Sequence, residues 1–376
     1  MEMFEIVSEV PTPGYFIREE LEARGWSQRD LAYILGTPEQ AVNMIISGKR
    51  GVSPEMAKAL GKAFDVNPDL FANLQKAYDM SRARDPDPGV EKRARLQNAY
   101  PVREMIKRGW LVDTDAALLE EQMARFFCVA NSNEIPHIAH AARKTSYEGV
   151  PPAQLAWLFR VKQIAESMAA PRYSAKALKE ALPRLRQLLI EPEEARHVPR
   201  ILSECGVRFI LVECLPNAKI DGVCFWLNKH APVIGMSIRH DRIDNFWFVL
   251  RHEIEHVLQG HGMDEEIIDI ELEGERAGSG ANISEEERIA NAAAADFCVP
   301  QSEIRSFIAR KSPFFAERDV LGFAKRLQIH PGIVVGQIQN HTKRWDLLRK
   351  HLAKIRQFVL PGTMVDGWGQ TAPVSI

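Results

Sequence analysis

The hydrophobic pattern of the chain changes its period near residue 207, and this change limits the possible folds more than any other feature. Before it, apolar residues recur at helical spacing, as in the leucine stripe from Leu178 to Leu189. After it, VRFILVECL, DGVCFWLN and PVIGMSI are short runs of β-branched and aromatic residues between turn residues, and they predict three strands. Helical spacing returns at Asn245. We therefore expect a mainly α fold with one α+β part that contains a small sheet.

The chain has 376 residues, more than the roughly 250 residues that a single core usually reaches, so several domains are expected. The polar, proline-containing stretch SRARDPDPGVEKRAR predicts a linker, and the closing sequence GTMVDGWGQTAPVSI predicts a flexible tail. The expected divisions are a helical first domain at 1–80, the linker at 81–99, a helical spacer at 100–203, the sheet-containing domain at 204–345, and a C-terminal helix and flexible tail at 346–376.

Charge and composition exclude several classes of protein. The 48 Lys and Arg residues nearly balance the 50 Asp and Glu residues, so any contact with nucleic acid must be local. No apolar run approaches the roughly 18 residues of a membrane-spanning helix. The first residues, MEMFEIVSEV, also lack the order of a signal peptide. We therefore expect a cytoplasmic protein with no membrane partner. The five cysteines form no CxxC pair, which argues against a disulfide framework or a cysteine zinc site.

The segment WSQRDLAYILGTPEQAVNMIISGKRGVSP has the pattern of two short helices joined by a tight turn. Ser27 can cap the first helix, with Asp30 three residues later completing the cap. Gly36 permits the turn, and Pro38 suits the start of the second helix. This pattern predicts a helix-turn-helix, whose second helix can enter the major groove of DNA. The alternative is a helical hairpin that docks a protein partner.

Six polar side chains of this segment are the expected contacts with DNA. Gln and Asn side chains on the second helix can bond adenine edges, and a glutamate can accept from cytosine. Gln28, before them on the first helix, is expected to meet a phosphate, and the two basic residues after the second helix neutralise further phosphates. The expected DNA-binding residues are Gln28, Glu39, Gln40, Asn43, Lys49 and Arg50.

This first domain resembles the XRE-type helix-turn-helix family, and within it the HigA-like antitoxins. The resemblance runs from PTPGYFIREELEARGWSQRDLA through SGKRGVSPEMAKAL to DLFANLQKAYDM. It implies binding to palindromic operator DNA as a homodimer, repression of the protein's own operon, and a toxin protein as a further possible partner.

The sequence FWFVLRHEIEHVLQGH contains the second motif with chemical content. His252 and His256 are four residues apart on a helical pattern, so both imidazoles project from one face and can chelate one zinc ion. Glu253 is placed beside them to take a proton from a metal-bound water. The alternative is two core histidines that bond to neighbours. His261 does not fit the HExxHxxGxxH pattern, because it comes one position too early.

Catalytic zinc needs a third protein ligand and one open position. Glu287, which begins a helical pattern 31 residues after His256, is the expected third ligand, and Asn291 one turn later is expected to orient a ligand. Glu287 also completes a capping box with Ser284, so a purely structural role is the alternative. Glu285 and Glu286 are alternative candidates for the third ligand.

The region from about 200 to 340 resembles the ImmA/IrrE family of zinc metallopeptidases. HEIEH, the strands before it, and the block from Glu287 to Asn291 that leads to Pro300 carry the resemblance. It implies a zincin-like domain in which His252, His256 and Glu287 bind Zn²⁺ and Glu253 is the general base. It further implies cleavage of a regulatory protein such as a repressor. The strand PVIGMSI is expected to pair with an extended substrate.

Two further features of the C-terminal part are not assigned a function by these motifs. The segment 31–46, LAYILGTPEQAVNMII, has a weak echo in FAKRLQIHPGIVVGQI at 323–338. The basic stretch KRWDLLRKHLAKIR at 343–356 is interpreted first as a solvated helix face, with DNA contact as the alternative.

Taken together, the motifs predict a DNA-binding transcriptional regulator whose zinc metallopeptidase-like domain senses a signal or performs regulated proteolysis. One alternative is a HigA-like antitoxin that neutralises an RNase toxin and carries an inert peptidase fold. Another is a protease whose first domain docks a partner repressor.

Overall fold

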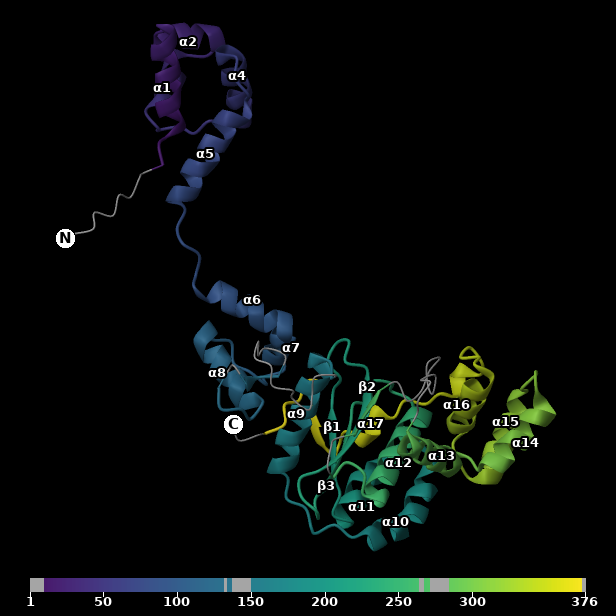
Figure 1. The fold of residues 1–376 in the computed structure, drawn as a ribbon. Coiled ribbons are helices and arrows are strands. Elements are labelled where there is room, and N and C mark those ends of the chain that lie inside the picture. Colours follow the sequence, from purple (N-terminus) through teal and green to yellow (C-terminus); the bar gives the residue numbers. More distant parts are fainter. Residues whose placement is uncertain (1–9, 132–133, 137–149, 264–266, 271–283, 374–376) are drawn as a thin grey trace. The chain divides into compact units, whose positions relative to one another are not determined.

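The computed structural model spans residues 1–376 and describes residues 10–131, 134–136, 150–263, 267–270 and 284–373. It contains two compact units, separated between Asp87 and Pro88 (Figure 1). The described residues form one hydrophobic core in the first unit and two in the second. Within the described ranges, no helix combines the length and apolar character that crossing a membrane requires.

The first unit is a bundle of short helices. Its described helices are α1 (Pro13–Arg24), α2 (Gln28–Leu35), α3 (Glu39–Ile46), α4 (Pro54–Phe64) and α5 (Asp69–Arg82). Each helix contributes a side chain that is at most 2% exposed, namely Ile17, Leu31, Val42, Leu60 and Phe71. Because burying an apolar side chain of this size contributes roughly 1.5–3 kcal/mol, this shared core holds the five helices together.

The turn between α2 and α3 has the predicted chemistry. Ser27 accepts a hydrogen bond from the backbone N–H of Asp30, whose carboxylate accepts one from the backbone N–H of Ser27 at 2.7 Å. Gly36 ends α2 with a φ of 63°, which favours glycine. A Cβ on Gly14 would lie 2.5 Å from the carbonyl oxygen of Ile45, so α1 and α3 touch through their backbones. The predicted helix-turn-helix is confirmed.

The second unit surrounds one sheet with helices. Its described α-helices are α6 (Gly89–Ala99), α7 (Val102–Lys107), α8 (Ala116–Phe126), α9 (Pro152–Ser167), α10 (Ala175–Gln187), α11 (Val198–Glu204), α12 (Ile243–Gln259), α13 (Glu285–Cys298), α14 (Gln301–Lys311), α15 (Glu317–Leu327), α16 (Pro331–Thr342) and α17 (Arg356–Val359). Short 3₁₀ helices are η2 (Leu188–Ile190), η3 (Pro192–His197) and η4 (Arg349–His351).

The sheet is mixed and has the strand order β4-β2-β3-β1-β5. The strands are β1 (Arg208–Val212), β2 (Ile220–Trp226), β3 (Pro232–Met236), β4 (Ile267–Ile270) and β5 (Met364–Asp366). β1 runs parallel to β3 and β5, and β2 runs antiparallel to β3 and β4. The three predicted strands are present, and two further strands form the edges.

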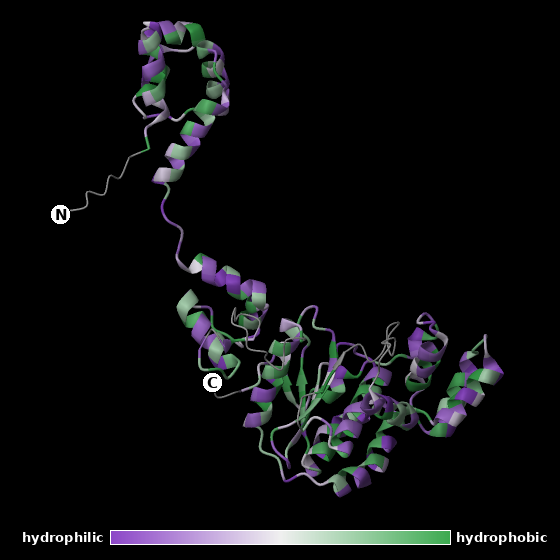
Figure 2. Cartoon of the chain, viewed as in Figure 1, coloured by the Kyte–Doolittle hydropathy of each residue, from purple (hydrophilic) through white to green (hydrophobic). Residues whose placement is uncertain are grey.

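Both faces of the sheet are buried. Along β1, Phe209 and Leu211 join the core that contains α12, whereas Ile210 and Val212 join the core that contains α9. This alternation is the period of a strand, whose successive side chains point to opposite faces. Figure 2 shows the same result as apolar residues concentrated on the strands. The sheet therefore lies between two helical layers.

Two expected boundaries differ from the structure. The expected linker at 81–99 is too long, because α5 continues to Arg82 and α6 begins at Gly89. The expected spacer at 100–203 is not a separate body either. Trp157 of α9 is fully buried and its Nε1 donates to the carbonyl of Val212 in β1 at 2.9 Å, so this helix is one layer of the sheet domain.

The closing segment is the third difference. The sequence predicts a flexible tail within 346–376, but Met364–Asp366 forms β5, which pairs with β1. The Asp366 side chain is fully buried, and it accepts from Arg160 Nε at 3.0 Å and from Trp110 Nε1 at 2.7 Å. These bonds hold the tail to α9 and to the segment after α7.

The expected role of PVIGMSI is also wrong. This strand, β3, lies in the centre of the sheet and pairs with β1 on one side and β2 on the other. Its backbone hydrogen-bonding groups are therefore used within the sheet, and it cannot pair with an extended substrate. Strands with an open edge among the described ones are β4 and β5.

Candidate functional site

The outer face of α3 is the first candidate site. Val42, Ile45 and Ile46 are buried in the core of the first unit. Glu39, Gln40 and Asn43 are exposed, as the helical period requires when the apolar stripe faces inward. The predicted base-contacting residues therefore lie on one solvent-facing side of the second helix.

Side-chain contacts join α2 to this face. Asn43 Nδ2 donates to Gln28 Oε1 at 3.2 Å, so the expected phosphate contact and an expected base contact support each other. Arg29 Nε lies 3.4 Å from Glu39 Oε2. Sequence analysis missed Arg29, although the helical pattern places it on the exposed side of α2. Its charge offsets the negative charge of Glu39 on this face.

The loop after α3 carries the two basic residues. The backbone N–H groups of Lys49 and Arg50 both donate to the carbonyl of Met44, at 2.9 and 3.0 Å. Gly48, with a φ of 70°, allows the chain to turn back in this way. Both basic side chains are exposed. The loop is thus held by backbone bonds, while its cations are available to phosphates.

The second candidate site lies between α12 and α13. His252 and His256 are fully buried on α12, and their Nε2 atoms are 3.0 Å apart. Glu287, in the first turn of α13, places Oε2 3.4 Å from His252 Nε2 and Oε1 3.3 Å from His256 Nε2. The structure thus brings together the three residues that sequence analysis expected to bind metal.

The spacing of these three residues fits a tetrahedral metal ion. Ligand atoms at about 2.0–2.1 Å from a tetrahedral zinc lie about 3.3–3.4 Å from each other. The observed separations of 3.0, 3.3 and 3.4 Å match that value closely. Two imidazoles and one carboxylate are also a donor set that zinc accepts, with one position left open.

The two histidines also control the charge of Glu287. Burial alone raises the pKa of its carboxyl, but hydrogen bonds and positive charge from His252 and His256 outweigh burial and hold the pKa well below its usual range. The competing acids lie elsewhere: Glu285 pairs with Arg288, and Glu286 Oε1 lies 3.8 Å from His261 Nε2.

Glu253 is fully buried on the side of α12 that faces β2. A Cβ on Gly222 would lie 1.9 Å from Glu253 Oε1, so only glycine leaves room for this carboxylate. Sequence analysis missed Gly222, and the available signal was a glycine inside a strand pattern, which often marks close approach of another group.

His261 supports the site from outside. Its Nδ1 lies 3.0 Å from Nδ1 of His256, the ring nitrogen that faces away from Glu287. Its own carbonyl accepts from Trp226 Nε1 at 2.8 Å, which fixes its backbone to β2. Such a partner orients a ligating imidazole. Asn291, the expected orienting residue, is half-buried on α13.

The charge of Glu255 is balanced by neighbouring residues of α12. Its carboxylate accepts from Arg251 at 2.7 Å and from Gln259 at 2.7 Å. Burial raises the pKa of Glu255, but these two hydrogen bonds and the charge of Arg251 outweigh it and lower the pKa.

The segment echoing α2 and α3 forms helices α15 and α16, but it is not a second DNA reader. Most of α16 is buried, including Val334, Val335 and Ile338, and it packs against α12. A helix buried in this way cannot enter a groove.

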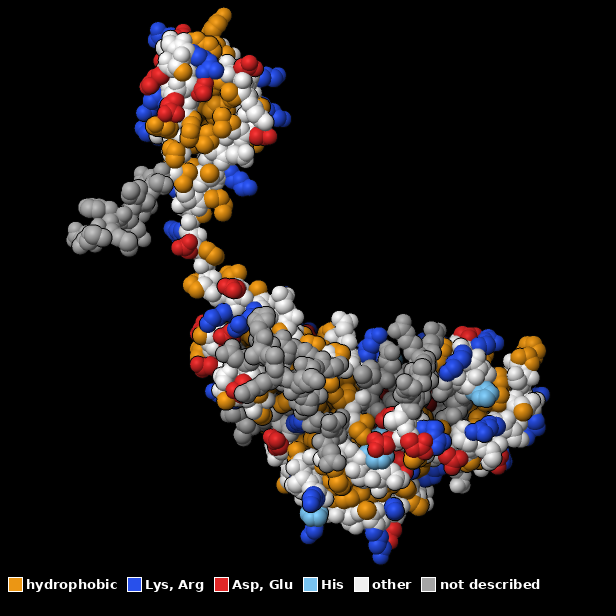
Figure 3. All heavy atoms as spheres, in the orientation of Figure 1, with side chains coloured by type: hydrophobic (Ala, Val, Ile, Leu, Met, Phe, Trp, Pro, Cys, Tyr) orange, Lys and Arg blue, Asp and Glu red, His pale blue; other side chains and the backbone are white. Residues whose placement is uncertain are grey.

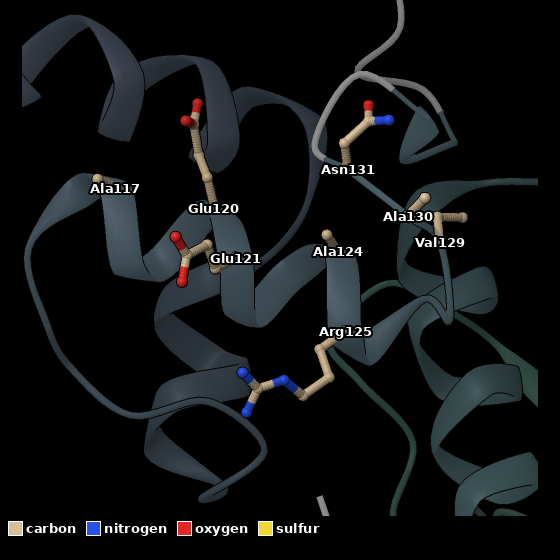
Figure 4. A pocket seen from close by; sticks show the side chains of 8 residues that line it. All are labelled: Ala117, Glu120, Glu121, Ala124, Arg125, Val129, Ala130 and Asn131. Carbon is tan, nitrogen blue, oxygen red and sulfur yellow. The ribbon is translucent and has the colours of Figure 1, made fainter.

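A cavity of about 570 Å³ lies beside α8, apart from both candidate sites. Its lining residues are Ala117, Glu120, Glu121, Ala124, Arg125, Val129, Ala130 and Asn131. Figure 4 shows Glu120 and Arg125 pointing in different directions from α8, so their charges do not converge on one ligand.

Comparison with known proteins identifies the first unit. A helix-turn-helix family model matches residues 17–71. The virulence-associated protein A' of Dichelobacter nodosus is 38% identical over 73 residues, which are 19% of this chain and 64% of that protein, so this chain spans less than two thirds of it. The uncharacterized HTH-type transcriptional regulator YddM of Escherichia coli is 30% identical over 73 residues, 19% of this chain and 78% of that protein.

Among solved structures, an addiction module antidote protein of the HigA family from Coxiella burnetii is 34% identical. The match covers 19% of this chain and 79% of that chain, with a TM-score of 0.19.

Proposed function

Because the chain belongs to the helix-turn-helix family through residues 17–71, we propose that it is an operator-binding transcriptional regulator whose second unit is a zinc metallopeptidase-like domain. The polar outer face of α3 supports the DNA-binding part. The convergence of His252, His256 and Glu287 on one point supports the metallopeptidase part.

In this proposal α3 lies in the major groove. Gln40 and Asn43 bond base edges there, and Gln28, held by Asn43, contacts a phosphate. Lys49 and Arg50 neutralise phosphates beyond the helix. The regulator acts on the operator of its own operon, as the resemblance to HigA-like proteins implies.

A homodimer on a palindromic operator is part of the proposal. The first unit exposes large apolar side chains, among them Tyr33 at 89% and Met80 at 69% exposure, and Figure 3 shows apolar atoms gathered on its surface. Exposed apolar surface of this kind suits a second copy of the chain. Light scattering with and without operator DNA tests it: a mass of one chain in both conditions contradicts the dimer.

In the proposed metal centre His252, His256 and Glu287 hold Zn²⁺, which when bound polarises a carbonyl and activates water. Glu253 provides a fully buried carboxylate against β2, where it can accept a proton. His261 keeps the ring of His256 in place.

An extended segment of a regulatory protein is the proposed substrate, and β4 is the strand that receives it. Among the described strands β4 lies at an edge of the sheet, and its register on β2 places Asp269 opposite Gly222, the residue that faces Glu253. Addition of a strand to such an edge supplies backbone hydrogen bonds without requiring a particular sequence.

The metal content of protein purified without chelator tests the second unit. We expect about one zinc per chain, and loss of that zinc in His256→Ala. Absence of zinc from the unaltered protein, even after zinc is offered, contradicts the peptidase part and leaves the DNA-binding part standing.

Antitoxin function is the second candidate, because the resemblance of the first domain to HigA-like proteins runs through its closing helix. If the protein is an antitoxin, a toxin encoded next to its gene arrests growth, and co-expression of this protein relieves the arrest. Relief that survives His256→Ala would favour the antitoxin with an inert peptidase fold.

A further inference from the structure

Positive charge is concentrated in one part of the second unit. Between Gln301 and Arg356 the chain has twelve Lys or Arg residues and four Asp or Glu residues, a net charge of +8. The whole chain carries −2, so the remainder carries −10. A charge of this size in 56 residues marks a local surface, because the overall balance provides no general attraction for anions.

Most of these cations face solvent, and the four acids of this range are too few to offset the twelve cations. One acid of this range, Asp346, is exposed, whereas the other three are half-buried. The exposed cations are Arg305, Arg310, Arg318, Lys325, Arg326, Lys343, Arg344, Arg349, Lys350 and Lys354. Figure 3 shows blue side chains on the lobe that Figure 1 labels α14 to α16. We call residues 301–356, which carry these cations, the basic lobe.

The amino end of α15 draws three segments of the basic lobe together. Glu317 Oε2 lies 2.6 Å from Nζ of Lys350 in η4, and Asp319 Oδ2 lies 2.9 Å from Nζ of Lys311 at the end of α14. Arg318 stands between these two acids in the chain and is itself exposed. The ends of α14 and η4 and the start of α15 therefore present their cations side by side.

Several of these cations are not used in ion pairs. Within the part of the chain that the structure describes, the ion pairs of the basic lobe involve Lys311, Arg326, Arg344, Lys350 and His351. No carboxylate oxygen described there lies within 4.0 Å of the charged nitrogens of Arg318, Lys325 or Arg349. Phe314, three residues before the start of α15, is 85% exposed. Cations without a carboxylate partner are available to an anionic partner such as a phosphate.

We infer that the basic lobe is a second DNA-binding surface, which contacts the phosphate backbone of duplex DNA without reading its sequence. Contacts from Lys and Arg to phosphates are the common source of such binding. Base reading by α16, the sequence counterpart of α3, is excluded because this helix is buried against α12. The inference extends the proposed operator binding and rests on it: the same chain holds DNA through α3, which raises the local DNA concentration for the basic lobe.

The test compares two charge-matched variants of the full chain. The lobe variant carries Arg318→Gln, Lys325→Gln and Arg349→Gln. The control variant carries Lys176→Gln, Lys179→Gln and Lys229→Gln, which are exposed cations elsewhere in the second unit. A third variant, Lys49→Gln with Arg50→Gln, reports on the helix-turn-helix. Fluorescence anisotropy measures binding to a long mixed-sequence duplex across a salt series.

We expect the lobe variant to bind more weakly at low salt and to show a flatter dependence of log K on log salt, by roughly 0.9 for each phosphate that the variant no longer neutralises. The control variant should match the unaltered protein. The weakening should also be equal for duplexes of different sequence, because phosphates carry no sequence information.

Other outcomes distinguish DNA binding by the basic lobe from DNA binding by the helix-turn-helix. Unchanged binding by the lobe variant, together with weaker binding by the Lys49 and Arg50 variant, overturns the second surface and leaves the helix-turn-helix proposal. Weaker binding by the lobe variant, together with unchanged binding by the Lys49 and Arg50 variant, supports DNA binding by the basic lobe. It contradicts the proposed phosphate contacts of Lys49 and Arg50. Tight binding of polyglutamate instead of DNA, abolished in the lobe variant, overturns DNA as the partner in favour of an acidic protein.

Discussion

Gly222 of β2 and Glu253 of α12 are in such close contact that a Cβ at position 222 would lie 1.9 Å from Glu253 Oε1. The sheet therefore fixes where the buried carboxylate lies, and the helix fixes where the two histidines lie. A change at position 222 should move the carboxylate while leaving the three clustered ligand atoms in place.

Gly222→Ala is expected to destabilise the protein by about 1–3 kcal/mol, since it overpacks a filled interior. Thermal unfolding followed by circular dichroism measures the change. Gly322→Ala on α15 is the matched control, because no atom lies within 4 Å of the Cβ it would add. That control should stabilise by up to about 1 kcal/mol, as alanine favours a helix over glycine. Equal stability of both variants would contradict the close packing at Gly222.

His261→Gln is expected to weaken zinc binding by about 10–100-fold, because His261 holds the outer nitrogen of His256. Competition with a chromophoric chelator measures the affinity. Glu285→Gln serves as the control, since Glu285 pairs with Arg288 and not with the histidines. Zinc affinity that is unchanged in His261→Gln would show that His256 needs no such support.

Asn43→Ala is expected to weaken operator binding by about 1–3 kcal/mol, because it removes a base contact and the bond that positions Gln28. An operator selected from a duplex library by the unaltered protein provides the probe. Lys62→Gln on α4, exposed and away from α3, is the control. A variant that selects the same operator with the same affinity would remove Asn43 from the interface.

Asp366→Asn is expected to cost about 3–5 kcal/mol, because it leaves Arg160 as a buried charge without its carboxylate. Urea unfolding measures this destabilisation. Asp346→Asn breaks the exposed pair with Arg344 and should cost less than about 1 kcal/mol. A small effect at position 366 would mean that the tail adds little to the stability of the second unit.

His330 should make stability depend on pH. Its Nδ1 accepts from the backbone N–H of Gly332 at 3.0 Å and caps α16, and burial lowers its pKa below 6.5 despite the nearby carboxylates of Glu191, Glu193 and Asp244. Protonation therefore occurs more readily in the unfolded chain. In the window from pH 6.5 down to the lower folded pKa, the unfolded state binds more protons, so stability falls as the pH falls.

His330→Asn tests this dependence, because asparagine keeps the cap without titrating. The difference in unfolding free energy between the variant and the unaltered protein should be constant above pH 6.5 and should shift in favour of the variant below it. A difference that does not vary with pH would assign the cap no role in acid sensitivity.

The helix-turn-helix could be predicted nearly completely from the sequence, because it depends on local features. Ser27 and Asp30 cap α2 through bonds between residues three apart, and Gly36 adopts the turn conformation that its missing side chain allows. The outward position of Asn43 follows from the helical period alone. Arg29 was not predicted as part of this face, because its partner, Glu39, lies on another helix.

The second unit was harder to predict. Residues 364–366 are a short, polar-flanked run, and they form β5 only because β1 offers an open edge and Arg160 receives the carboxylate of Asp366. The central position of β3 likewise depends on which strands pair with it. Pairing between distant strands leaves little trace in the sequence of either one.

The sequence by itself determined the features that neighbouring residues produce. The two helices of the helix-turn-helix and their turn belong to this class. So does the shared face of His252 and His256, since a helix places residues four apart on the same face. Only the tertiary structure decided that Glu287, and not Glu285 or Glu286, completes the cluster. The tertiary structure alone also showed that Gly222 makes room for Glu253. These relationships join segments that approach each other only when the two cores form, so no local pattern encodes them.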